Sequence, residues 1–135
     1  MNAIRAVVLV CWLGGALGIA QAGPRVVVIC NAALSLADDD VQSIYLGDKQ
    51  LAGSTRLVPV DNASAQVAFL VHYVNLDAAK YRSRWIKKAF RDGLTAPETR
   101  ATDLTVIEFV RNTPGAIGYV MTAAPQGVTV LGGRP

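Results

Sequence analysis

The fold of this chain is decided by one stretch of its sequence, Asn112-Thr113-Pro114-Gly115-Ala116-Ile117-Gly118-Tyr119-Val120. Pro114 cannot continue a helix and Gly115 adopts a positive φ at little cost, so a helix should end here and a strand should follow. Ala116 and Gly118 are small, which lets another segment or a ligand approach that strand closely. Taken alone, the stretch predicts a helix-to-strand corner, because proline and glycine punctuate structure more often than they mark sites.

The N-terminus has the pattern of a secretory signal peptide. Arg5 supplies a positive charge, residues 6–19 form an apolar run, and Ala20-Gln21-Ala22 is a small-x-small cleavage site. The run is short for a membrane anchor, which needs about 20 apolar residues. We therefore expect a Sec-type signal peptide that is cleaved after Ala22, export to the periplasm or the medium, and no membrane span in the mature chain.

Residues 1–22 are thus assigned to the signal peptide and residues 23–135 to the mature protein. The mature part is long enough for one domain with a single modest core. The whole chain has a formal net charge of only +3 at pH 7. So small a positive excess does not favour nucleic acid as a partner, and neither does export. We expect one binding domain without a nucleic-acid partner.

Residue types that carry catalysis or bind metals are scarce in the mature part. Cys30 is its only cysteine, so no internal disulfide can form, and its apolar neighbours favour a small buried residue over a nucleophile. The single histidine, His72, has no partners at ligand spacing. The triplet Asp38-Asp39-Asp40 favours helix capping over metal binding, since successive side chains on a helix point in different directions. The sequence therefore predicts no enzyme, no metal site and no cofactor.

Hydrophobic patterns place strands and helices in a mixed order. Strands are predicted at residues 25–30, 56–60, 116–121 and 128–131, and helices at 38–46, 65–74, 78–91 and from 103 into the corner. Strand 25–30 is a continuous β-branched run, which suits a strand buried on both faces. Pro59 inside the second strand indicates an edge position or a strand end. The order favours an α/β domain in which helices flank a small sheet.

The helix predicted at residues 78–91 combines an apolar face with many basic residues. Its buried face is predicted to consist of Tyr81, Trp85, Ala89, Ile86 and Phe90. The basic residues that lie mostly around the rest are Lys80, Arg82, Arg84, Lys87, Lys88 and Arg91. Such a cluster is usually a solvated face, and the alternative is a surface for an acidic partner or a field that attracts an anionic solute.

A polar turn precedes the helix at residues 65–74. The turn Asp61-Asn62-Ala63-Ser64 follows a strand and contains residue types that cap helices. The order of strand, polar turn and helix N-terminus is one in which free backbone N–H groups can hold an anion. It is also the ordinary way in which a helix begins, so both interpretations stay open.

Three segments in this order resemble the periplasmic phosphate-binding proteins of ABC transporters. Ile44-Tyr45-Leu46-Gly47-Asp48-Lys49 resembles their I-F-x-G-K segment, Leu57-Val58-Pro59-Val60 their strand before the phosphate loop, and Thr113 to Val120 their P-G-A-I-G-Y-V strand. The similarity spans residues 26–131, and the last segment is the most specific. The resemblance implies the fold of a single lobe of a type II periplasmic-binding-protein-like protein.

Members of that family close two lobes around a phosphate with hydroxyls, backbone amides, an arginine and a carboxylate. Their phosphate loop reads R-x-x-x-S-G-T, and Ser64 matches its serine. Val60, Ala65 and Gln66 replace the arginine, the glycine and the threonine. Because Val60 cannot donate the two hydrogen bonds of an arginine, we expect binding of phosphate to be weak at most.

Two functions follow as expectations. In the first, the protein is a periplasmic solute-binding-like protein that binds phosphate or another small anion weakly. The anion would be held by Ser64 and the amides of Ala65 and Gln66, with polar contacts from Asp61 and Asn62.

In the second, the protein has lost the ligand and is an interaction module. It would use its basic helix, or an apolar face left open by the missing lobe, to dock on a membrane transporter or sensor protein or to form a homodimer. The residues predicted to bind the partner are Lys80, Arg84, Lys87, Lys88 and Arg91.

Overall fold

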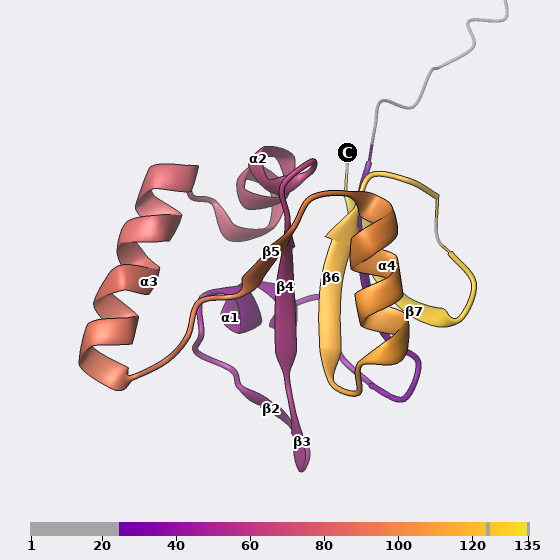
Figure 1. The fold of residues 1–135 in the computed structure, drawn as a ribbon, viewed down its shortest axis with the longest axis horizontal. Coiled ribbons are helices and arrows are strands. Elements are labelled where there is room, and N and C mark those ends of the chain that lie inside the picture. Colours follow the sequence, from indigo (N-terminus) through magenta and orange to yellow (C-terminus); the bar gives the residue numbers. More distant parts are fainter. Residues whose placement is uncertain (1–24, 124, 135) are drawn as a thin grey trace, which may run out of the picture.

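The computed structural model describes residues 25–123 and 125–134, so the predicted signal peptide and its cleavage site lie outside the described residues. This part of the chain has an α/β fold, in which helices flank a five-stranded mixed sheet (Figure 1). The predicted small mixed sheet flanked by helices is confirmed. Among the described residues, no helix has the length and apolar character needed to cross a membrane.

The sheet has the strand order β5-β4-β6-β1-β7. Its strands are β1 (Val26–Asn31), β4 (Val58–Asn62), β5 (Glu98–Arg100), β6 (Ala116–Val120) and β7 (Val128–Arg134). A separate hairpin consists of β2 (Leu51–Ala52) and β3 (Thr55–Arg56). The helices are α1 (Asp40–Tyr45), α2 (Gln66–Phe69), the π-helical turn η1 (Leu70–Val74) that continues α2, α3 (Ala78–Asp92) and α4 (Asp103–Asn112).

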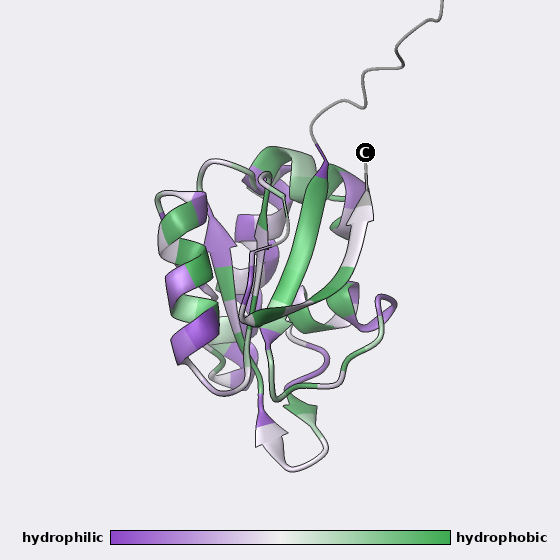
Figure 2. Cartoon of the chain, turned by 90° about the vertical axis from the view of Figure 1, so that its right-hand side faces the viewer, coloured by the Kyte–Doolittle hydropathy of each residue, from purple (hydrophilic) through white to green (hydrophobic). Residues whose placement is uncertain are grey.

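Strand β1 lies inside the sheet and is buried on both faces, as its β-branched sequence predicts. It pairs antiparallel with both β6 and β7, while β4 runs parallel to β5 and β6. Val28 and Cys30 belong to the core beneath α1 and η1, whereas Ile29 belongs to the core beneath α4. Figure 2 shows a long hydrophobic strand in the middle of the sheet, with hydrophilic residues on the helices and loops around it.

The Pro-Gly corner joins α4 to β6, and the predicted helix-to-strand turn is confirmed. Gly115 has φ +82°, and a Cβ atom there would lie 2.1 Å from the carbonyl oxygen of Arg56. At Gly118 a Cβ atom would lie 2.7 Å from Cγ1 of Val106 on α4. Gly115 therefore lets the corner pack against β3, and Gly118 lets α4 pack closely on β6.

Pro59 lies in β4, an inner strand, so the edge position is wrong and the strand-end alternative is right. The N–H of Val58 donates to the carbonyl of Gly115 on the β6 side. Because successive residues of a strand point their N–H groups to opposite sides, the nitrogen of Pro59 faces the β5 side. Strand β5 pairs with β4 only from Val60 onwards. The missing N–H of proline therefore costs the sheet no hydrogen bond.

The three aspartates lie at the start of α1, where Asp40 places a negative charge in the first turn as predicted, but the expected capping hydrogen bond is not made. The N-cap residue is Asp39, and its side chain makes no capping hydrogen bond. Asp40 instead accepts from the amide of Ala37 at 3.1 Å and pairs with Lys49 at 2.9 Å. Asp40 thus anchors the segments on both sides of α1. Within the described part of the chain, no group of histidine, cysteine or acidic residues could hold a metal ion.

Candidate functional site

Asp61 occupies the buried end of β4, where it is only 2% exposed. One of its carboxylate oxygens accepts a hydrogen bond from the hydroxyl of Tyr81 at 2.9 Å, and the other accepts one from Tyr119 at 2.8 Å. Burial raises the pKa of Asp61 to about 6, and the two tyrosine hydrogen bonds partly offset this rise. The side chain therefore joins β4 to α3 and β6.

Asn62 is the centre of a second hydrogen-bond cluster at the same strand end. Its Nδ2 donates to Oδ1 of Asp103 at 2.7 Å and to the carbonyl of Tyr119 at 2.9 Å. Its Oδ1 accepts from the amide and the hydroxyl of Ser64, at 3.0 and 2.6 Å. The other oxygen of Asp103 accepts from the amide of Met121 at 3.1 Å. Asn62 thus connects β4, the start of α4 and the end of β6.

The five residues predicted to bind an anion lie within residues 61–66, but their polar groups have different roles. The side chains of Asp61 and Asn62 are committed to partners inside the fold. Ser64 is exposed, and its hydroxyl lies 3.3 Å from the carboxylate of Asp103, which would repel an anion. The amide of Ala65 donates to the carbonyl of Asn62 at 3.1 Å.

The predicted capping role of this turn is wrong. Asp61 and Asn62 are part of β4, because the strand continues two residues beyond Val60. Helix α2 begins at Gln66, and its N-cap residue, Ala65, has no side chain that could accept a hydrogen bond. Anion binding at this turn stays a prediction, and the geometry supplies few groups for it.

Helix α3 has a narrower buried face than predicted. Tyr81 and Trp85 are buried as expected, but Ala89, Ile86 and Phe90 are exposed. The buried and exposed apolar residues differ in their angular position around the helix axis, which the sequence already specifies. Tyr81 and Trp85 lie one turn apart on one side, and Ile86 and Phe90 lie one turn apart on another. The two pairs therefore do not form one wide buried face: the first is buried and the second is exposed.

Three long side chains with polar tips fasten α3 to the rest of the molecule. Tyr81 donates to Asp61, and Nε1 of Trp85 donates to the carbonyl of Tyr45 at 3.0 Å. Lys88 is only 7% exposed and forms an ion pair with Asp48. Lys88 therefore serves the fold, and its predicted contact with a partner stays a prediction.

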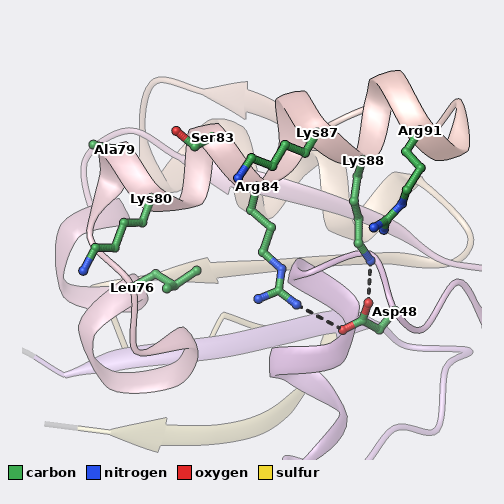
Figure 3. Close-up of a pocket in the computed structure, with 9 residues that line it drawn as sticks. All are labelled: Asp48, Leu76, Ala79, Lys80, Ser83, Arg84, Lys87, Lys88 and Arg91. Atoms are coloured by element: carbon green, nitrogen blue, oxygen red, sulfur yellow. Dashed lines mark hydrogen bonds and ion pairs between the residues drawn. The ribbon is translucent and has the colours of Figure 1, made fainter.

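All the basic residues of α3 except Arg82 line one concave surface, drawn in Figure 3. This hollow has a volume of about 600 Å³. The residues that line it, called the basic hollow below, are Asp48, Leu76, Ala79, Lys80, Ser83, Arg84, Lys87, Lys88 and Arg91. The structure thus brings together all five basic residues predicted to bind a partner. Asp48 is the one acidic residue among these described lining residues.

Three of the exposed cations of the basic hollow, Lys80, Arg84 and Lys87, have weak partners or none among the described residues. Arg84 lies 3.8 Å from Asp48, which is already paired with Lys88. Lys80 lies 3.9 Å from the exposed Asp77, whereas Arg91 donates two hydrogen bonds to the carboxylate of Asp92, at 2.9 and 3.0 Å. Lys87 makes no ion pair with any residue that the structure describes. Long exposed pairs such as that of Lys80 are weak. The five cations of the hollow outnumber the three carboxylates that pair with them, so its net charge is positive.

Comparison of the chain with protein-family models and with the curated proteins found no match. The resemblance to phosphate-binding proteins therefore rests on the three sequence segments.

Proposed function

We propose that the protein is an exported, non-catalytic binding domain that uses the basic hollow of α3 to bind an acidic partner. The convergence of Lys80, Arg84, Lys87 and Arg91 on one concave surface supports this most directly. Charges of one sign in a hollow reinforce each other's potential and attract counter-charges from solution. The proposed partner is an acidic surface of a membrane transporter or sensor protein.

We also propose that the scaffold is one lobe of a type II periplasmic-binding-protein-like fold. The three segments that resemble phosphate-binding proteins adjoin one another in space. The hydroxyl of Tyr45, from the first segment, lies 2.9 Å from the carbonyl of Val60 and 3.1 Å from that of Ile117, in the second and third. Three matching segments that meet at one buried polar contact support a relationship with phosphate-binding proteins better than three matching segments far apart in the fold would.

Phosphate or another small anion is the second candidate ligand. Lys80, Arg84 and Lys87 follow one another along α3 and face the same hollow, which favours this ligand there. The turn at Ser64 is less suitable, since Asp103 lies beside it. Small anions held by exposed cations alone bind weakly, because water competes for both groups.

A peptide of eight glutamates is a suitable probe for the proposed function. Isothermal titration of the purified protein should detect binding that weakens steeply between low and physiological salt, since the Debye length shortens to about 8 Å at 0.15 M. The double variant Lys80→Gln with Lys87→Gln should weaken binding. Arg82→Gln is the matched control, because Arg82 is an exposed cation of α3 outside the basic hollow.

An equal loss in the control variant would contradict the proposal, and so would the absence of heat at millimolar peptide. Titration with phosphate and with sulfate tests the second candidate separately. If neither ion gives heat at millimolar concentration, small-anion binding is wrong.

A further inference from the structure

Helix α3 carries a row of large apolar residues that no described part of the molecule covers. Ile86 is 61% exposed and Phe90 is 96% exposed. They lie four residues apart, so their side chains are neighbours on the helix surface. Figure 1 shows α3 as the outermost helix on its side of the molecule. A fully exposed phenylalanine beside a second apolar residue marks a surface that gains free energy when it is covered.

This apolar row is continuous with the basic hollow. A second hollow, of about 450 Å³, is lined by Ile86, Lys87, Phe90 and Arg91. Lys87 and Arg91 also line the basic hollow. One surface of α3 is therefore apolar along one side and basic along the other, and the two cations form the boundary.

The spacing of these rows matches a helix. The exposed cations stand at positions 80, 84, 87 and 91, and the apolar residues at 86 and 90. Rows that repeat every three or four residues along the 15 residues of α3 would lie against complementary rows of a second helix of similar length. The basic side is concave, so it suits a protruding segment better than a flat bilayer.

We propose that the acidic partner presents an amphipathic helix to α3. Its acidic row lies in the basic hollow, and its adjoining apolar row packs on Ile86 and Phe90. This inference rests on the proposed function and specifies the chemistry of the partner. Phe90 is the anchor, since exposed aromatic residues that become buried account for much of the binding energy of protein interfaces.

Two synthetic helical peptides of about the length of α3 test the inference. Both carry the same row of glutamates, and the adjoining row is leucine in one and glutamine in the other. Fluorescence anisotropy with the purified protein should show the leucine peptide binding about tenfold more tightly, as expected for burial of one aromatic anchor. Phe90→Ala should remove most of that difference, since only Ile86 would still contact the leucine row, and should leave binding of the glutamine peptide unchanged. Leu104→Ala is the matched control, because Leu104 is 64% exposed on α4, outside both hollows.

The outcomes separate this inference from the proposed function. Equal affinities for the two peptides would overturn the inference of an amphipathic helix, and so would an affinity for the leucine peptide that Phe90→Ala does not change. Either result would be compatible with the acidic partner of the proposed function. Failure of both peptides and of the eight-glutamate probe would overturn both proposals. Two other results, each without peptide binding, would likewise overturn the inference. Sedimentation of the protein with vesicles of phosphatidylglycerol that depends on Phe90 would assign the surface to lipid. A dimer in sedimentation velocity that depends on Phe90 would assign it to a second copy of the chain.

Discussion

Two polar regions of this molecule are both predicted from the sequence to bind a ligand or a partner, and they differ in the folded chain. The end of β4 places Asp61 and Asn62 in the interior, where each is held by hydrogen bonds to side chains of other elements. The basic hollow of α3 keeps four exposed cations around one carboxylate, Asp48. The first region uses its polar groups to hold the fold together, and the second leaves them available to a partner.

The difference follows from the cost of burial. A buried polar group must be hydrogen-bonded, or its desolvation destabilises the fold. Once Asp61 and Asn62 enter the core, their partners are tyrosines, a serine and an aspartate of the same chain, and little capacity is left for a ligand. Lysine and arginine on an exposed helix face have no such requirement. Substitutions should therefore affect stability at β4 and binding at α3.

The largest effect is expected from Asn62→Ala. The substitution removes the partner of Ser64 and leaves Oδ1 of Asp103 without its 2.7 Å hydrogen bond in a half-buried place. Loss of several buried hydrogen bonds together should lower the free energy of unfolding by about 3 kcal/mol. Urea denaturation measures this. A loss under about 1 kcal/mol would show that the cluster is not structural.

The next effect concerns pH and Asp61. Its folded pKa of about 6 lies above the unfolded value of about 3.9, so the folded state binds the proton more tightly. The stability that this group contributes is present below pH 4 and is lost as the pH rises through 6. Between pH 4 and pH 7 the free energy of unfolding should fall by about 2 kcal/mol more in the natural protein than in Asp61→Asn. Parallel pH curves for the two proteins would contradict the raised pKa.

A smaller effect is expected from Tyr81→Phe, which removes one of the three side chains that fasten α3. Asp61 would lose one of its two donors, at a cost of about 1–2 kcal/mol in unfolding free energy. Relative to the natural protein, the rate of amide hydrogen exchange should then increase more in α3 than in α4. Arg82→Gln, next to it on the exposed side, serves as the control and should leave exchange unchanged.

The smallest effect on stability is expected from Lys87→Gln in the basic hollow. Lys87 is exposed and makes no ion pair with a described residue, so the free energy of unfolding should change by under about 0.5 kcal/mol. Binding of the eight-glutamate peptide should nevertheless weaken. Unaltered binding in the same titration would show that Lys87 does not contribute to binding, and that the basic hollow does not differ from the β4 region in the way proposed.

Local signals predicted much of the scaffold. The corner at Gly115, the buried strand β1 and the helix α3 with its start at Asp77 and end at Gly93 all depend on near neighbours in sequence. The candidate site was predicted less well. The five basic residues of α3 were identified, but Lys88 serves the fold, and Asp61 and Asn62 lie in a strand. Those differences arise from partners such as Tyr119, which is 58 residues away from Asp61.

The sequence by itself determined the type and approximate place of most helices and strands, because glycine, proline and hydrophobic periodicity act over a few residues. It predicted neither β5 nor the two residues by which β4 continues beyond Val60. Only the tertiary structure decided which polar groups are used and which are left over. Asp61 faces two tyrosines because β4, β6 and α3 meet there, and Phe90 is bare because α3 is fastened by Tyr81, Trp85 and Lys88 on another side. Burial depends on contacts between distant segments, and no local pattern specifies those contacts.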